Sequence, residues 1–152
     1  MTRSPITDYI VEEVWRQGHD VEAPDGLQRV AGMIHAWSAV LQMPPRPLEI
    51  GDVIALGRWI EPCNAEGFRK VAVRVGRRIP PEYHEVPHLV KALLTQQNTL
   101  EPLEFYREFE LIHPFEDGNG RVGKILLNWS NRTLLTPVFP PDDFWGTPIL
   151  NP

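Results

Sequence analysis

Apolar side chains recur at every third or fourth position over most of the chain, the spacing that gathers them on one face of an α-helix. The pattern therefore predicts a mainly α-helical protein. The expected helices cover about 5–17, 25–43, 48–60, 85–97, 101–112 and 119–135.

Start and stop residues support several of these boundaries. Ser4 can cap the first helix and Pro5 suits its first position, whereas Gly18 favours its end. The proline-rich run 44–47 forces an extended break after the second helix, because proline lacks a backbone donor and restricts the residue before it.

One segment follows a different period. Over 68–75 three valines alternate with other residues, which is the two-residue period of a β-strand. Gly76 and the prolines beyond it would let the chain turn back, so we expect a short β-hairpin rather than a large sheet. The alternating residues are Val71, Ala72, Val73, Arg74 and Val75.

The composition narrows the class of protein. With 152 residues, 42% of them hydrophobic, the chain is expected to form one domain over 1–152. A net charge of −5 gives no general attraction to nucleic acid, so none is expected as a partner. No apolar run is long enough for a membrane span, and the N-terminal residues lack the apolar core of a secretory signal. Together with a single cysteine, Cys63, these features indicate a cytoplasmic protein.

The candidate chemistry is concentrated in the stretch HPFEDGNGRVGK, residues 113–124. If the last helix starts near Asn119, then Gly118, Asn119 and Gly120 lie at its N-terminus. Free backbone amides and the positive end of the helix dipole attract an anion there, and the glycines permit close approach.

Charged side chains around these glycines indicate a polyphosphate rather than one phosphate. Arg121 and Lys124 are three residues apart, so they project from the same helical face. Asp117 is placed to hold Mg²⁺ between phosphate oxygens, and His113 can act as a general base on a hydroxyl. Phe115 is expected to anchor the loop in the core. The set predicts phosphoryl or nucleotidyl transfer.

The run HPFEDGNGR resembles the signature of the Fic family, His-x-Phe-x-Asp/Glu-Gly-Asn-Gly-Arg-x-x-Arg, and departs from it only at the last position. The resemblance implies a Fic-type helical bundle with a small β-hairpin flap before the active-site loop, a place that 68–75 would fill. It covers about 25–137, flanked by an N-terminal helix and a proline-rich C-terminal tail.

The resemblance also implies transfer of AMP from Mg-ATP to a Tyr, Thr or Ser hydroxyl of a target protein. His113 would take the proton of the attacking hydroxyl, and Asp117 would bind Mg²⁺. The run 118–120 would cradle the phosphates, and Arg121 would neutralise the leaving pyrophosphate. The flap, 71–75, would pair with a target segment through main-chain hydrogen bonds.

The departure from the signature is Lys124, which stands where the family has its last arginine. Lysine offers a point charge and arginine a planar, two-pronged donor, so a catalytically weak nucleotide-binding module is one alternative. Another is a Doc-like protein kinase that moves the γ-phosphate, although the intact run 118–121 argues against it.

Many family members carry an inhibitory segment, Ser/Thr-x-x-x-Glu-Gly/Asn, whose glutamate pairs with that last arginine. A search from each serine and threonine finds no match, and the nearest run, SPITDY, has Asp8 in place of the glutamate. Inhibition is therefore expected from a separate antitoxin-like protein, from a homo-oligomer, or not at all.

A remote alternative is a zinc hydrolase, because His84, Glu85 and His88 fit the pattern His-Glu-x-x-His. Pro87 disfavours one continuous helix through both histidines, and no third ligand is marked.

Five basic residues cluster around the expected hairpin. We expect them to form a solvated face that protects an edge strand, and a docking surface for an acidic target is the alternative. They are Arg69, Lys70, Arg74, Arg77 and Arg78.

Overall fold

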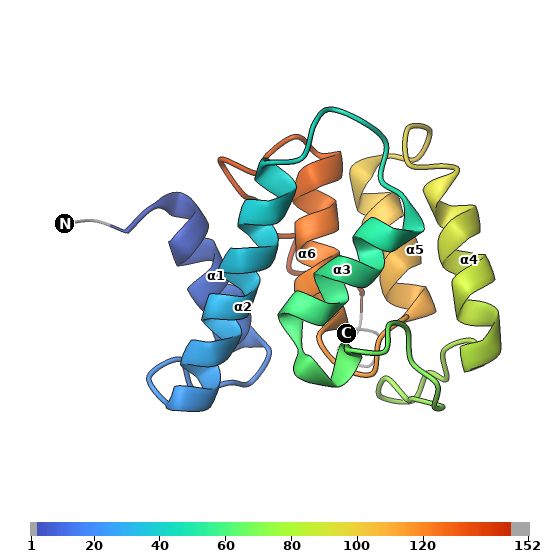
Figure 1. Ribbon diagram of the computed structural model, residues 1–152, viewed down its shortest axis with the longest axis horizontal. Coiled ribbons are helices and arrows are strands. Elements are labelled where there is room, and N and C mark those ends of the chain that lie inside the picture. Colours follow the sequence, from blue (N-terminus) through green and yellow to red (C-terminus); the bar gives the residue numbers. More distant parts are fainter. Residues whose placement is uncertain (1–2, 147–152) are drawn as a thin grey trace.

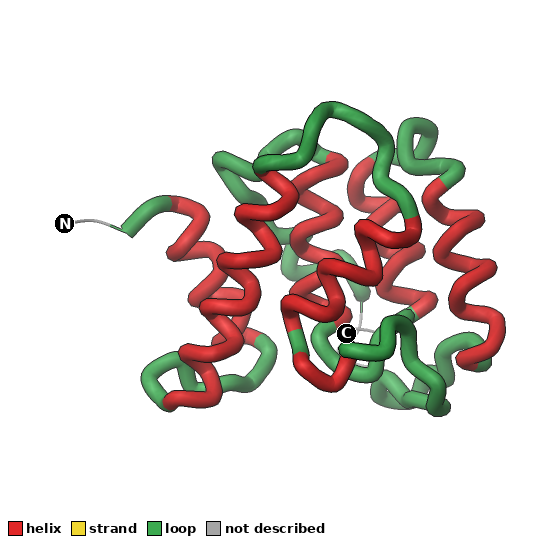
Figure 2. Tube along the Cα trace, viewed as in Figure 1, coloured by secondary structure: helices red, strands yellow, loops and turns green. Residues whose placement is uncertain are grey.

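The structure is a computed structural model that describes residues 3–146, so the end of the proline-rich tail lies outside the described residues (Figure 1). Helices and loops make up the described chain, which confirms the mainly helical prediction (Figure 2). None of the described helices is long and apolar enough to cross a membrane. The elements are α1 Pro5–Arg16, α2 Pro24–Leu41, α3 Ile50–Ile60, the 3₁₀ turns η1 Pro62–Asn64 and η2 Tyr83–Glu85, α4 Val86–Leu94, α5 Pro102–Ile112 and α6 Asn119–Ser130.

Local signals set the ends of the first and last helices. Ser4 Oγ accepts a hydrogen bond from the Thr7 N–H at 3.1 Å, so the predicted cap of α1 is used. α6 begins at the predicted residue, Asn119, after Gly118 in a left-handed conformation. It ends at Ser130, earlier than expected, where the chain turns through Arg132 with φ of 60°.

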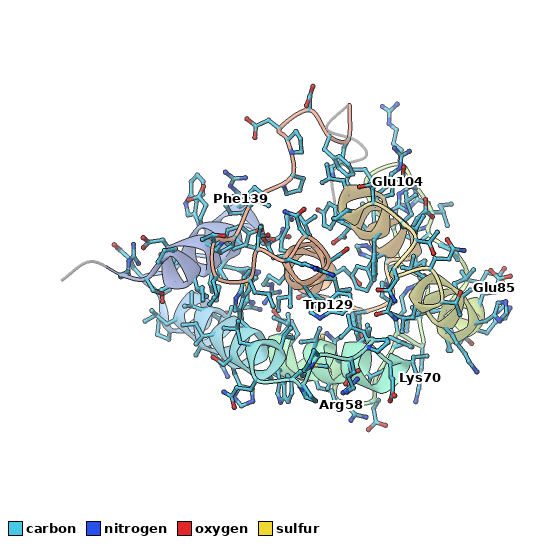
Figure 3. All side chains as sticks on the ribbon, turned by 90° about the horizontal axis from the view of Figure 1, so that it is seen from above. Arg58, Lys70, Glu85, Glu104, Trp129 and Phe139 are labelled. Atoms are coloured by element: carbon cyan, nitrogen blue, oxygen red, sulfur yellow. The ribbon has the colours of Figure 1, made fainter. Side chains whose placement is uncertain are left out.

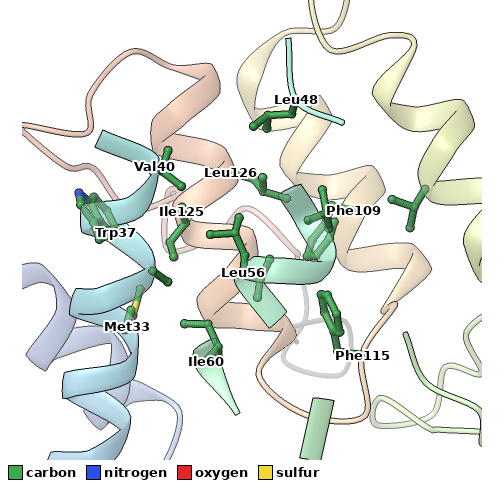
Figure 4. Close-up of a cluster of buried hydrophobic side chains, with 14 of the residues drawn as sticks. Met33, Trp37, Val40, Leu48, Leu56, Ile60, Phe109, Phe115, Ile125 and Leu126 are labelled. Carbon is green, nitrogen blue, oxygen red and sulfur yellow. The ribbon is translucent and has the colours of Figure 1, made fainter. Parts of the chain in front are cut away.

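α6 lies in the centre of the bundle. In Figures 1 and 3, α1 and α2 lie on one side of it, α5 and then α4 on the other, and α3 crosses its face. Every residue of α6 from Asn119 to Asn128 is buried. Figure 4 shows the packing around it, where Leu126 and Phe109 meet the side chains of α3. The charged residues of the motif on α6 are therefore inside the protein and not on its surface.

The predicted β-hairpin is wrong, because residues 3–146 contain no β-strand. The segment forms one isolated bridge, in which Val75 and Arg78 exchange two backbone hydrogen bonds of 2.9 Å across a turn at Gly76. Beyond this turn come Pro80 and Pro81, which have no backbone N–H to continue a ladder. The flap is therefore an extended loop held by other contacts (Figure 2).

Candidate functional site

The site begins with a strained turn at the end of α5. His113 caps this helix in the left-handed region, with φ of 52° and ψ of 62°. The left-handed conformation costs a residue with a Cβ about 1–2 kcal/mol, so contacts with neighbouring residues must stabilise His113 in it. The turn leads the chain from α5 into the loop that starts α6.

The asparagine of the motif shapes this loop. Asn119 Oδ1 accepts a hydrogen bond from the Phe115 N–H at 2.8 Å, and its Nδ2 donates to the Phe115 carbonyl at 2.9 Å. The Phe115 ring is fully buried against α3, where a Cβ at Gly57 would lie 2.2 Å from it. Both polar atoms of the Asn119 side chain are bonded to the Phe115 backbone. A phosphate at this residue would therefore be bound by the Asn119 backbone N–H.

Two glycines bring neighbouring elements close to the start of α6. A Cβ at Gly118 would lie 2.6 Å from Ile60 Cγ2, and one at Gly120 would lie 2.6 Å from Gln17 Nε2. Beside them, the Asp117 side chain is 54% exposed, and its Oδ1 accepts the Gly118 N–H at 2.7 Å. An exposed carboxylate next to a helix N-terminus that no side chain caps fits Mg²⁺ and phosphate.

Lys124 is already paired in this conformation. Its Nζ lies 3.3 Å from Glu13 Oε2 of α1, and the two side chains are 9% and 1% exposed. Gln17 Nε2 donates to the same Glu13 oxygen at 2.8 Å. Burial raises the pKa of Glu13, and the charge of Lys124 opposes that shift. α1 and its C-cap, Gln17, thus bring a carboxylate to Lys124 and an amide to Gly120, two residues expected to contact phosphates.

Sequence reasoning missed Glu13, although a signal existed. The search required serine or threonine four residues before the glutamate, and this chain has Tyr9 there and Val14 after it. Tyr9 serves as a buried hydroxyl: it donates to the Val138 carbonyl at 2.8 Å and accepts from Asn128 Nδ2 at 3.2 Å. A search for any hydroxyl residue one helical turn before a glutamate would have found the pair.

Arg121 faces α3 and is not exposed. Its Nη2 lies 2.7 Å from Glu61 Oε1, and its side chain is 1% exposed. Glu61 also accepts from Arg29 Nε at 2.8 Å, so one carboxylate joins two guanidinium groups. Asp117 is 3.8 Å from the same Arg121 nitrogen. The structure therefore places Arg121 near the N-terminus of α6, where it pairs with Glu61, and Arg29 shares that carboxylate; the sequence marked neither Glu61 nor Arg29.

His113 is uncharged at neutral pH. Burial lowers its pKa to about 4, and the positive charges of Arg78 and Arg69 act in the same direction, whereas Asp117 opposes them. A neutral imidazole is the form that accepts a proton from a hydroxyl, as a general base must.

Glu110 is a buried carboxyl that the motif does not include. It is completely buried on α5, and neither carboxylate oxygen has a hydrogen-bond partner among residues 3–146. Burial raises its pKa to about 8, although the charge of Lys124 opposes the shift. Glu110 is therefore largely protonated near neutral pH, and Glu13 is the carboxylate that forms the ion pair with Lys124.

Replacing Glu110 by glutamine is expected to flatten the fall in stability between pH 4.5 and pH 8. Below its ordinary pKa of 4.5 the carboxyl is protonated in both the folded and the unfolded chain. Above it the unfolded chain loses the proton first, so the free energy of unfolding falls by about 1.4 kcal/mol per pH unit until the folded pKa is reached. Urea unfolding at several pH values measures this slope. Glu108→Gln, an exposed change on the same helix, is the control, and parallel curves for both variants would contradict the assignment.

The flap residues lie beside this site as part of a loop. Val71 is 46% exposed and Val75 is buried, and Ala72 and Arg74 between them are exposed. The Val71 carbonyl accepts from Arg69 Nη1 at 3.1 Å, and Arg69 Nη2 donates to the Ile112 carbonyl at 3.3 Å, which ties the loop to the residue before His113.

The zinc alternative gains no support. His84 lies in η2 and His88 in α4, so they do not share one helix. Within residues 3–146 no group of three histidine, cysteine or acidic side chains could hold a metal ion.

Sequence comparisons give the same family throughout. A model of the Fic/DOC family matches residues 47–130. A probable protein adenylyltransferase of Aquifex aeolicus (strain VF5) is 39% identical over 72 residues, which cover 41% of this chain and 22% of that protein. The protein adenylyltransferase fic-1 of Caenorhabditis elegans is 32% identical over 107 residues, which cover 62% of this chain and 20% of that protein.

Solved structures share the fold. A Fic family protein from Desulfovibrio desulfuricans G20 has a TM-score of 0.68 at 23% identity, over 85% of this chain and 47% of that one. A fragment of Fic-1 from C. elegans has a TM-score of 0.65 at 23% identity, over 91% of this chain and 50% of that one. The chain thus spans about half of the solved chains and less than a third of the relatives named above. Since the family model covers more than half of its residues, the chain belongs to the Fic/DOC family.

Proposed function

We propose that the protein transfers AMP from Mg-ATP to a Tyr, Thr or Ser hydroxyl of a target protein. The observation that carries the proposal is the combination of a neutral histidine with an anion site. His113 is fixed one loop before the N-terminus of α6, and Asp117 of the same loop presents an exposed carboxylate. A base for a hydroxyl and a site for a metal-bound phosphate are the two requirements of this reaction.

Each residue has one task in this reaction. His113 takes the proton of the attacking hydroxyl, and Asp117 holds Mg²⁺. The backbone N–H groups at 118–120 hold phosphate oxygens, and Lys124 and Arg121 neutralise their charge. Mg-ATP, when bound, supplies the AMP group and pyrophosphate as the leaving group.

Glu13 acts as an inhibitory residue within the chain. Its carboxylate pairs with Lys124, and Gln17 lies against Gly120. ATP phosphates would therefore compete with Glu13 for Lys124 and with Gln17 for the space at Gly120. The earlier expectation, that inhibition comes from a separate antitoxin-like protein or a homo-oligomer, remains a prediction beside this one. Removal of Glu13 tests it below.

The target approaches along the flap. Val71, Ala72 and Arg74 are exposed on a loop of extended chain, which suits main-chain pairing with an incoming segment. Such pairing holds a hydroxyl near His113 without reading much of the target sequence.

ATP labelled on the α- or the γ-phosphate tests the proposed reaction. The purified protein and its Glu13→Ala variant are incubated with Mg²⁺, labelled ATP and cell extract. We expect protein label from the α position, because the AMP group moves. Label from the γ position alone would assign the protein to the kinase branch. Absence of label from both positions with both proteins would contradict transfer altogether.

A further inference from the structure

The basic residues around the flap do not form one solvated face. Lys70, Arg74 and Arg77 are exposed, as expected, but Arg69 is 3% exposed and Arg78 is half-buried. Neither Arg69 nor Arg78 lies within salt-bridge distance of an acidic side chain in residues 3–146. Two guanidinium groups turned inward without a carboxylate must be stabilised by other acceptors.

Those acceptors are the carbonyls at the end of α5. Arg78 Nη2 donates to the Glu110 carbonyl at 3.3 Å and Arg78 Nη1 to that of Leu111 at 2.9 Å. Arg69 Nη2 donates to the Ile112 carbonyl at 3.3 Å. Arg69 Nε donates to the His113 carbonyl at 2.7 Å.

The backbone N–H of Arg69 donates to the next carbonyl along, that of Pro114, at 2.9 Å. Two residues therefore satisfy the carbonyls of 110–114, five consecutive residues around the left-handed turn. The last carbonyls of a helix lack partners within it, and its C-terminal end carries negative partial charge. The carbonyls at this end of α5 therefore balance the positive charge of both arginines.

The same two residues hold the flap. Arg69 donates to the Val71 carbonyl near the start of the segment and to the Pro81 carbonyl at its end. Arg78 forms the backbone bridge to Val75 that closes the turn between them. Figure 1 shows the loop passing below the lower end of α5, where these contacts are made.

We propose that Arg69 and Arg78 are positioning residues that clamp the segment 69–81 to the end of α5 and thereby fix the turn at His113. The proposal rests on the proposed function for its catalytic meaning, because His113 is the base there. Neither arginine is bonded to the residues assigned to phosphate or Mg²⁺. The clamp therefore acts on the geometry between the flap, which guides the target, and the base, and not on ATP binding.

Arg78→Gln tests the clamp in two independent measurements. Hydrogen exchange of the backbone amides in 69–81 and at His113 is expected to accelerate at least about tenfold, since the two side-chain bonds from Arg78 to the end of α5 are lost. In the transfer assay, the kcat is expected to fall about 10- to 100-fold while the KM for ATP stays unchanged, because a displaced base slows chemistry without weakening ATP binding.

Arg77→Gln is the matched control, because this neighbour is exposed and its side chain forms no hydrogen bond or ion pair within residues 3–146. Its exchange rates are expected to equal those of the unchanged protein. Exchange in Arg78→Gln as slow as in Arg77→Gln would overturn the clamp, even with transfer intact. Fast exchange in Arg78→Gln, together with no transfer by the unchanged protein, would leave the clamp standing and reject the proposed function.

Arg78→Lys gives a second test if the glutamine variant does not fold. Lysine keeps the charge at the end of the helix but lacks the planar fork whose two separate nitrogens reach two neighbouring carbonyls. We expect exchange in 69–81 at least about threefold faster than in Arg77→Lys. Equal rates in these two variants would overturn the proposal.

Discussion

Glu13→Ala is expected to raise AMP transfer about 10- to 100-fold at ATP concentrations below saturation. A hydrogen bond to a charged group contributes about 1.5–3 kcal/mol, and each 1.4 kcal/mol corresponds to a factor of ten in binding. Glu13 makes such contacts with both Lys124 and Gln17, and all of them oppose phosphate binding. Titration of ATP, by calorimetry and by transfer of the α-label, measures the gain directly.

Glu12→Ala controls for loss of negative charge on the same helix. Glu12 pairs with Arg16 at the surface, where its side chain is 44% exposed, and it does not reach the anion site. The Glu13 variant is also expected to unfold at a lower temperature, since Lys124 loses its buried partner. If both variants bind ATP as the unchanged protein does, Glu13 has no inhibitory role.

His113→Ala is expected to abolish most of the transfer, with a loss of about 10²- to 10⁴-fold in kcat. His113 is the base assigned in the proposed reaction, and its neutral form can accept a proton. Because burial lowers its pKa to about 4, transfer by the unchanged protein should persist to acidic pH. The acidic limb of the rate profile is expected near pH 4, well below the ordinary value of 6.5.

Two comparisons make this result specific. His88→Ala removes an exposed histidine of α4 and is expected to leave transfer unchanged, which also tests the zinc alternative. ATP affinity of His113→Ala should equal that of the unchanged protein, because the imidazole acts on the hydroxyl of the target. Full transfer by His113→Ala would show that another group is the base.

The sequence predicted what depends on neighbouring residues. Helix periodicity and caps gave the helices, and Ser4 and Asn119 start two of them where expected. Gly118 and Gly120 predicted a candidate anion site at the helix start, because they flank the first helical residue in the sequence. These features follow from contacts within one or two helical turns, where spacing along the chain is also distance in space.

What the sequence could not predict depends on contacts between distant segments. Glu13 meets Lys124 across 111 residues, and the local pattern of Tyr9 one turn before Glu13 does not show that the two side chains meet. Arg69 and Arg78 looked like solvated charge, because only the fold shows that the end of α5 lies beside them. The hairpin prediction failed for a related reason: the valines had the right period, but Pro80 and Pro81 stood where their partner strand had to be.

The position of Glu13 in α1 and of Lys124 in α6 has a consequence for biosynthesis. A ribosome adds about 5–20 residues per second, so the lysine emerges on the order of ten seconds after the glutamate. No nascent chain therefore contains the finished anion site without the helix that covers it. Premature termination before α6 removes Lys124 and the proposed anion site together, whereas loss of Glu13 alone requires a change within α1 itself.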